Sequence, residues 1–436
     1  MCGQTPVRAA AGVRLVRLET NGAGTGREGE RAGGAGREWT RRGARGHNGI
    51  LRQAPWAGAR DQTMPNPGTL RYNRFLSQAG QEGGSRRFAS AAAGQAVLIT
   101  GAGGYIGSAL AMALAAAGPA KMLLLDSSEQ GLYGIEQRLE AARSGVPVEF
   151  ALGSVTDAGL LGRLLGRARP AAVYHAAAFK QVPMLESNPV AAVRNNALGT
   201  YTLAQAALES GVATLVLVST DKAVNPRSIM GATKRMAELT VTALSGPRTR
   251  MNAVRLGNVI GSTGSVIPLF REQIARREPV TVTDPEASRY FLSLRDAVEA
   301  ILAGGAAECS GRILLPELGE PERIVDIARF LIDAAGDGAG DEIPIRMIGL
   351  RPGEKLQEEL TFPTESCDGC AAGGLKTMVT PAPAPAELHA RMEQLARHAA
   401  SGDVAGLVAA ITAMVPEYEP SSVVRAAVCA GGRAGR

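Results

Sequence analysis

The sequence predicts an α/β fold, in which helices cover both faces of a doubly wound parallel sheet and a smaller C-terminal region follows. Two observations lead to this fold class. Short apolar runs alternate with segments long enough for helices from residue 95 onward, and a glycine-rich turn joins the first run to the first helical stretch. Such runs are typical of parallel strands buried on both faces.

Six apolar runs are the expected strands, and they lie at residues 96–100, 122–125, 148–152, 171–174, 214–218 and 252–256. An alanine-rich stretch at 109–117 predicts the first helix. After residue 257 the alternation loosens, and glycine, proline and charged loops dominate up to residue 360. A Pro/Ala linker at 381–385 then precedes two helical patterns at 387–398 and 404–414.

Residues 1–94 differ from the rest of the chain in charge and texture. They hold 15 arginines, no lysine and 6 acidic residues, whereas the remaining 342 residues hold 32 basic and 35 acidic side chains. Because their apolar residues show no helical or strand period, we expect a disordered, low-complexity head. A targeting segment and a translation start near Met64 are alternatives. The mildly acidic body argues against a nucleic-acid partner, since phosphate contacts need clustered basic groups.

The cysteines and the hydropathy indicate the compartment. Five cysteines, an odd number, are typical of reduced thiols in a cytoplasmic protein. Cys367 and Cys370 form a lone CxxC, so we expect no metal site. No run of 18 apolar residues occurs, so we expect no membrane span.

The segment from Thr100 to Gly107 reads TGAGGYIG and joins the first expected strand to the first helix. Its glycines, Gly101, Gly104 and Gly107 among them, permit a tight turn and let the backbone approach a pyrophosphate at the helix N-terminus. Asp126 closes the second strand 19 residues after Gly107. A carboxylate there binds ribose hydroxyls and repels a 2′-phosphate, which favours NAD over NADP. A glycine turn without a ligand is the alternative.

A second group of polar residues follows the fifth strand. Thr220, Asp221 and Lys222 end that strand, and Met230 and Lys234 follow in a helical stretch. Strand ends of an open parallel sheet face the ligand crevice. Lys234 would hold a nicotinamide ribose and stabilise a developing alkoxide. Asp221 and Lys222 are an acid and a base, as removal of water across a carbon–carbon bond requires.

The use of lysine supports this placement. The chain has six lysines against 41 arginines, and four of the six, Lys180, Lys222, Lys234 and Lys355, lie in the motif-rich segments. An ammonium can lose its proton, whereas a guanidinium cannot. Ordinary solvated charges are the alternative for each lysine taken alone.

Six motifs in order carry a family resemblance over about residues 95–360. They are TGAGGYIG (100–107), HAAAFKQVPMLESNP (175–189), STDKAVNPRSIMGATKR (219–235), RLGNVIGSTGSVIPLF (255–270), TDPEASRYF (283–291) and GLRPGEKLQEEL (349–360). Together they resemble the polysaccharide-biosynthesis (CapD-like) nucleotide-sugar 4,6-dehydratases of the extended short-chain dehydrogenase/reductase superfamily. The resemblance implies a Rossmann-type NAD-binding domain at 95–257, a substrate-binding region at 258–365, and a linker with C-terminal helices at 366–436.

The resemblance also implies a reaction and a set of site residues. NAD takes a hydride from C4 of a UDP-N-acetylhexosamine (UDP-N-acetylglucosamine first), water leaves across C5 and C6, and the hydride returns at C6. Lys222 would be the base at C5, Asp221 the acid at the C6 hydroxyl, and Thr220 a partner of O4. Asn196 would organise the site backbone. The resemblance further implies NAD contacts at Tyr105, Ile106, Ala176 and Ala177, and substrate contacts at Lys180, Asn258, Arg289, Arg351 and Glu354.

One position departs from most of the superfamily. Met230 stands where a tyrosine is common, and a thioether cannot take the proton of the C4 hydroxyl. Asp221, Thr220 or a water chain must then do so. A UDP-sugar epimerase and a non-catalytic nucleotide-binding scaffold are the competing functions. A homo-oligomer is a further expectation from the resemblance.

Overall fold

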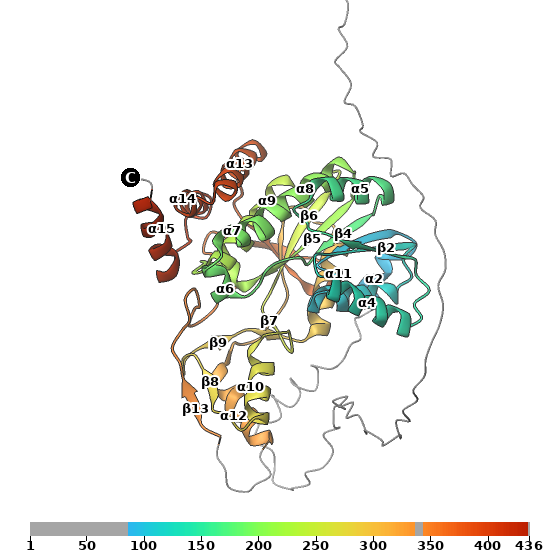
Figure 1. Ribbon diagram of the computed structural model, residues 1–436. Helices are drawn as coiled ribbons and strands as arrows, with labels where there is room; N and C mark the ends of the chain where they lie inside the picture. Colours follow the sequence, from blue (N-terminus) through green and yellow to red (C-terminus); the bar gives the residue numbers. More distant parts are fainter. Residues whose placement is uncertain (1–85, 336–342, 435–436) are drawn as a thin grey trace, which may run out of the picture. The chain divides into compact units, whose positions relative to one another are not determined.

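A nine-stranded sheet forms the centre of the computed structural model, which describes residues 86–335 and 343–434 (Figure 1). Its strands lie in the order β14-β15-β11-β6-β5-β4-β1-β2-β3. The six predicted strands are β1 Ala96–Thr100, β2 Lys121–Asp126, β3 Val148–Leu152, β4 Ala172–His175, β5 Thr214–Thr220 and β6 Arg250–Leu256, and they pair in parallel. The predicted fold class is confirmed.

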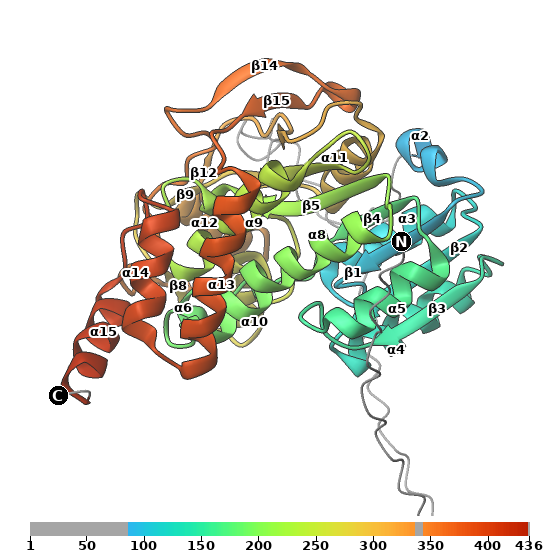
Figure 2. The ribbon, with the colours of Figure 1, turned by 90° about the horizontal axis from the view of Figure 1, so that it is seen from above.

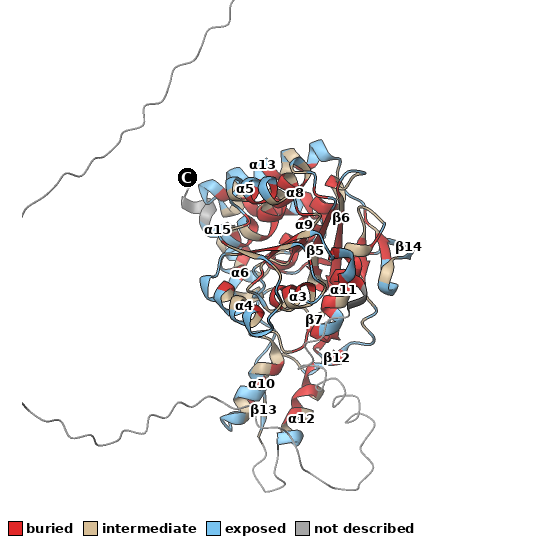
Figure 3. Cartoon of the chain, turned by 90° about the vertical axis from the view of Figure 1, so that its right-hand side faces the viewer, coloured by how far each residue is buried: buried red, intermediate tan, exposed pale blue. Residues whose placement is uncertain are grey.

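Successive residues of each strand enter different cores, because side chains alternate between the faces of a sheet. In β1, Leu98 belongs to one core, whereas Val97 and Ile99 belong to the other. The first core contains residues of α5 (Ala158–Ala168), α8 (Gly199–Glu209), α9 (Ile229–Leu244), α13 (Pro385–Ser401) and α14 (Val404–Met414). The second contains residues of α2 (Arg86–Ala89), α3 (Tyr105–Ala115), α4 (Glu129–Ala141) and α11 (Leu294–Ala306). Buried residues therefore line both faces of the sheet (Figure 3).

A smaller region has a core of its own, which includes Ile267, Phe270 and Ile324. Its helices are α10 (Val266–Ala275) and α12 (Ile324–Ala335). Its short strands are β7 (Asn258–Val259), β8 (Val280–Val282), β9 (Ser288–Arg289), β10 (Phe291–Leu292), β12 (Glu322–Arg323) and β13 (Ile345–Met347). They pair as β7 with β10, β9 with β12 and β8 with β13. This region lies beyond the end of β6 (Figure 1).

The remaining helices are α6 (Val182–Glu186), α7 (Pro189–Ala192), the π-helix η3 (Val193–Leu198) and α15 (Ser422–Ala434), with single 3-10 turns η2 (Ser90–Ala92), η4 (Asp221–Ala223) and η5 (Ala372–Gly374). Figure 2 shows α13, α14 and α15 side by side at one end of the described chain, away from the strands β14 and β15. None of the helices in residues 86–335 and 343–434 has the length and apolar character that a membrane crossing requires.

The central sheet draws on more of the chain than the predicted boundaries suggest. β11 (Ile313–Leu315) comes from the expected substrate region, and β15 (Lys376–Val379) and β14 (Ser366–Cys370) come from the expected C-terminal segment. β15 runs antiparallel to both of its neighbours, β11 and β14. At the other boundary, Phe88 and Ala92 are buried in the second core, although the predicted head extends to residue 94. Residues 1–85 of that predicted head lie outside the described residues.

A buried ion network fastens the chain after β13 to the main sheet. Arg255 of β6 donates to both Glu238 of α9, at 2.8 Å, and Glu365, at 2.9 Å, and all three side chains are fully buried. Arg255 also donates to the Leu360 carbonyl at 2.7 Å. Arg235 lies with its guanidinium 4.2 Å from the centre of the Phe362 ring. The network therefore fixes both ends of the segment 360–365.

We expect Arg255→Ala to lower the free energy of unfolding by about 3–5 kcal/mol, because it removes one of the two buried guanidiniums that face Glu238 and Glu365 and leaves only Arg235 to balance two carboxylates. Urea denaturation of the full chain measures this change. Arg397→Ala is the matched control, since the Arg397 side chain is 70% exposed and 4.0 Å from Glu393. The control should change stability by less than about 0.5 kcal/mol. Equal losses in the two variants would contradict the assigned role of the network.

Candidate active site

The glycine turn between β1 and α3 is packed against its neighbours so closely that a side chain cannot be added. Gly101 has φ +69°, and a Cβ built there would lie 2.6 Å from the Ala177 nitrogen. A Cβ on Gly107 would lie 2.0 Å from the Gly101 oxygen. Gly104 precedes the first residue of α3 in an extended conformation. The turn thus exposes the N-terminus of α3, where free N–H groups can bind a phosphate.

Asp126 stands at the end of β2, next to this turn. Its Oδ2 accepts a hydrogen bond from the Gly103 nitrogen at 2.9 Å, and its Oδ1 accepts one from the Ser128 nitrogen at 2.9 Å. The half-buried carboxylate is therefore held in a fixed orientation beside the turn. Each oxygen retains acceptor capacity for a ribose hydroxyl.

Tyr105 and Ile106 occupy the first turn of α3, and both pack against the second core. The Tyr105 hydroxyl donates to the Ile260 carbonyl at 2.9 Å. This bond ties α3 to the smaller region. Ala176 and Ala177 directly follow β4, and the Ala176 nitrogen donates to the Thr100 carbonyl at 3.0 Å. All four residues thus lie next to the glycine turn, and their contacts with NAD stay a prediction.

Lys234 of α9 reaches the end of β5, where its Nζ donates to the Val218 carbonyl at 2.6 Å. Burial lowers its pKa to about 8, against an opposing effect of Glu238. The charge of Lys234 acts on His175, which lies at the end of β4. The pattern of apolar runs did not indicate a role for this histidine. Burial and the Lys234 charge lower the pKa of His175 to about 3. Its Nδ1 lies 2.7 Å from the Thr100 hydroxyl, so the neutral ring connects β4 to β1.

Asn196 holds the backbone that follows β4. It lies in the π-helix η3 and is buried. Its Oδ1 accepts from the Phe179 nitrogen at 2.8 Å, and its Nδ2 donates to the Phe179 carbonyl at 3.0 Å and to the Thr233 hydroxyl at 3.1 Å. π-Helical turns are frequent at functional sites. These bonds support the expectation that Asn196 organises the site backbone.

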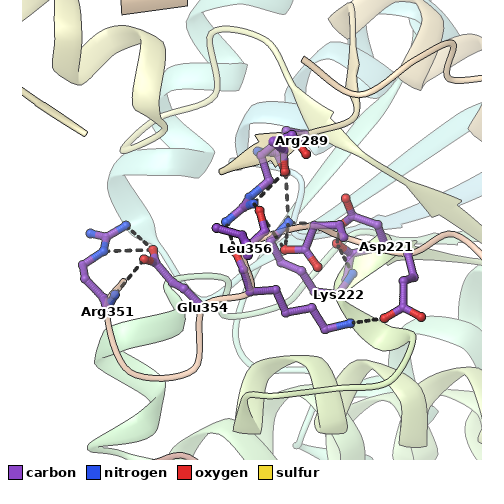
Figure 4. A network of polar contacts seen from close by, with 12 residues as sticks. Asp221, Lys222, Arg289, Arg351, Glu354 and Leu356 are labelled. Carbon is purple, nitrogen blue, oxygen red and sulfur yellow. Dashed lines mark hydrogen bonds and ion pairs between the residues drawn. The ribbon is translucent and has the colours of Figure 1, made fainter. Parts of the chain in front are cut away.

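The predicted acid and base meet at the end of β5 (Figure 4). The Lys222 Nζ lies 3.0 Å from the Asp221 Oδ1, and the Thr220 hydroxyl donates to the same oxygen at 2.9 Å. Asp221 is fully buried, whereas the Lys222 side chain is 22% exposed. The Lys222 Nζ also donates to the Asn258 Oδ1 at 2.9 Å. Asn258, expected to contact the substrate, therefore orients Lys222 in this structure.

A second carboxylate, which the motifs did not single out, completes this cluster. The Glu358 Oε1 lies 3.4 Å from the Lys222 Nζ and 3.8 Å from the Arg289 Nε. Burial alone would lower the pKa of Lys222, but Asp221 and Glu358 together raise it above its ordinary value. Lys222 is thus held as a cation between two acids. The only sequence signal for Glu358 is its place in the motif at 349–360.

The expected substrate cations take different positions. The buried Arg289 donates to the carbonyls of Leu356 at 2.9 Å and Lys355 at 2.7 Å, beside the Lys222 cluster. Arg351 instead pairs with Glu354, at 2.6 Å, on the exposed side of the same loop (Figure 4). Lys180 donates to the Thr263 carbonyl at 2.7 Å. Of these three cations, Arg289 is the one that lies within ion-pair distance of Glu358, the neighbour of Lys222, in the described chain.

Met230 lies in the first turn of α9 and is 5% exposed, within the first hydrophobic core. Its thioether can neither donate nor accept a mobile proton. Cys367 and Cys370 are exposed on the strand β14. Among the described residues, no group of three or more His, Cys, Asp and Glu side chains is arranged to hold a metal ion.

Comparisons with known proteins are consistent with this geometry. The family described as "Polysaccharide biosynthesis protein" matches residues 97–377. The capsular polysaccharide biosynthesis protein CapD of Staphylococcus aureus is 45% identical over 61% of this chain and 44% of its own length. A UDP-N-acetylglucosamine 4,6-dehydratase (inverting) of Campylobacter jejuni is 35% identical over 43% of this chain and 54% of its own length. The chain thus spans about half the length of these two relatives.

Epimerases and solved dehydratases match as well. A UDP-glucose 4-epimerase of Rickettsia rickettsii is 31% identical over 62% of this chain and 78% of its own length. The crystal structure of DesIV, a dTDP-glucose 4,6-dehydratase from Streptomyces venezuelae with NAD and TYD bound, has a TM-score of 0.55 and 26% identity. That match covers 61% of this chain and 88% of the DesIV chain.

The glycine turn yields a direct test. We expect Gly107→Ala to weaken NAD binding roughly tenfold or more, since the added methyl group would collide with the Gly101 carbonyl and displace the turn from the phosphates. Calorimetric titration with NAD measures the dissociation constant. Gly134→Ala in α4 is the control, because a Cβ there meets nothing within 4 Å. If a folded Gly107→Ala variant bound NAD as tightly as the control, the turn would not be the phosphate site.

Proposed function

The chain belongs to the polysaccharide biosynthesis protein family, and from this premise we propose that it removes water from a UDP-N-acetylhexosamine to give a 4-keto-6-deoxy sugar nucleotide. UDP-N-acetylglucosamine is the first substrate to test. The observation that carries the proposal is the contact of Asp221 with Lys222, at 3.0 Å, at the end of β5. Elimination needs an acid and a base close together, and a simple ketone-forming epimerase does not.

The cofactor of the proposed reaction is NAD. The cradle formed by Gly101 and Gly107, which a Cβ would fill, and the fixed carboxylate of Asp126 fit a dinucleotide without a 2′-phosphate. Bound NAD supplies a reversible hydride acceptor for the sugar. The buried Lys234 ammonium at the end of β5 would orient the nicotinamide ribose and favour negative charge on O4.

The substrate diphosphate would be held by few cations. Arg289 is buried beside the acid–base cluster, and within the described chain its guanidinium contacts backbone carbonyls and one oxygen of Glu358. A guanidinium in such a place can turn toward a phosphate with bidentate geometry. Arg351 and Lys180 lie nearer the surface and would contact the outer part of the nucleotide.

The proton steps need no further side chain once Lys222, a cation in the resting site, has given its proton to solvent, from which it regains one at the end of the cycle. When C4 is oxidised, the O4 proton passes to ionised Asp221 through Thr220, whose hydroxyl already donates to Asp221 at 2.9 Å. Neutral Lys222 then takes the proton from C5, and Asp221 gives its proton to the departing C6 hydroxyl, which leaves as water. After hydride has returned to C6, Lys222 returns the proton to C5. Both side chains regain their initial state, and the product is the substrate minus one water.

We expect UDP-N-acetylglucosamine labelled with deuterium at C4 to give a 4-keto product that is lighter by one water and carries the label at C6. Lys222→Ala should lower kcat by a factor of about 10²–10⁴, because it removes the base at C5. Mass and NMR analysis of the product measures both outcomes. Lys376→Ala is the matched control, because Lys376 is exposed on β15, and it should keep wild-type turnover.

Other outcomes separate the alternatives. A UDP-sugar product of unchanged mass with the label still at C4 would identify an epimerase, in agreement with the epimerase relatives and against dehydration. Binding of NAD without turnover of any UDP-sugar by the wild-type protein would support a non-catalytic scaffold, as the methionine at position 230 suggests.

A further inference from the structure

Lys222 lies between two buried carboxylates that come from distant parts of the chain. Asp221 belongs to η4 at the end of β5, and Glu358 belongs to the segment between β13 and β14. Their nearer oxygens lie 3.0 and 3.4 Å from the Lys222 Nζ, and their side chains are 0% and 3% exposed. Glu358 therefore approaches the Lys222 ammonium from a different segment than Asp221 does, and at almost the same distance.

Anchoring of its loop does not explain why an acid stands at position 358. The loop is already held by Arg289, which donates to the carbonyls of Lys355 and Leu356, and by Arg255, which donates to the Leu360 carbonyl. The Glu358 Oε2 is buried and has no hydrogen-bond partner among the described residues. A buried carboxylate with an unsatisfied oxygen costs free energy, so its charge points to a role in the site.

We propose that Glu358 is a positioning residue, which holds the Lys222 side chain in line with the substrate and controls how readily its ammonium loses a proton. The proposal rests on the proposed function, in which Lys222 takes the proton from C5. Glu358 acts only through Lys222 and touches none of the reacting atoms.

The charges around Lys222 determine the direction of the effect. Asp221 on its own element and Glu358 on the loop raise the pKa of Lys222, whereas burial and Arg289 on β9 lower it, and Asn258 on β7 is neutral. Lys222 must be neutral to take a proton, so the rate rises with pH through its pKa. Removal of the Glu358 charge lowers that pKa, so the rising limb of the pH–rate profile moves to lower pH.

The protonation of Lys222 can be followed without turnover. The chain has six lysines, so lysine-selective ¹³C labelling gives few signals, and Lys222→Arg identifies the one that matters. In Glu358→Gln the pKa of Lys222 should fall by about one unit or more, as expected for loss of an opposite charge at this distance. Glu359→Gln is the matched control, since Glu359 is half exposed and pairs with Lys355. An unchanged pKa in Glu358→Gln would overturn the proposal.

Turnover provides the second arm. In Glu358→Gln the rising limb of kcat against pH should move down by about the same amount, with a lower plateau and little change in KM. Glu358→Asp keeps the charge and should restore the position of the limb. A loss of kcat with the limb unmoved would show a merely structural role. If the wild type has no turnover, the proposed function fails, but the titration of Lys222 still decides whether Glu358 controls its proton.

Discussion

The site depends on the burial of one ammonium between two carboxylates at the carboxyl edge of a parallel sheet. Lys222 and Asp221 follow directly on β5, whose last residue, Thr220, pairs with Leu256 at the end of β6. The register places the polar ends of these strands side by side and keeps their apolar residues below them in the core. The charged side chains are thus largely shielded from water at the place where a substrate can bind. Because the local dielectric constant is low there, each electrostatic interaction in the site is strengthened.

The second carboxylate reaches this position because the loop that carries it is fixed at several places. The buried Arg255 holds Leu360 and Glu365 after the loop, and Arg289 of the smaller region holds Lys355 and Leu356 within it. Arg255 belongs to the main sheet and Arg289 to the smaller region. The two arginines therefore connect the main sheet and the smaller region to the segment that bears Glu358. The residues that stabilise the fold thus also fix the geometry of the site.

The sequence was sufficient for the parts of the fold that depend on local pattern. The continuous apolar run of β1, the glycine turn and the acid at the end of β2 are close in the chain, and parallel pairing brings them together. The short strand β11 has only three residues, and β14 is exposed along its length, so neither has a readable period. Glu358 and His175 could not be assigned roles, because their partners Lys222 and Thr100 are brought near only by the tertiary fold. Asn258 was placed by analogy among the substrate contacts, but its contact with Lys222 required the structure.

Lys222 and Lys234 show how the same side chain acquires different properties at one sheet edge. Both are largely removed from water, which by itself lowers the pKa of an ammonium. Lys234 donates to a backbone carbonyl, and its pKa falls to about 8. Lys222 faces two carboxylates, and its pKa rises. In the proposed reaction, Asp221 changes its charge beside Lys222 when it takes the O4 proton. Neutralising one of the two acids would lower the pKa of Lys222 and release its proton to solvent, so the proposed oxidation at C4 would be coupled to proton transfer at C5 through this one contact.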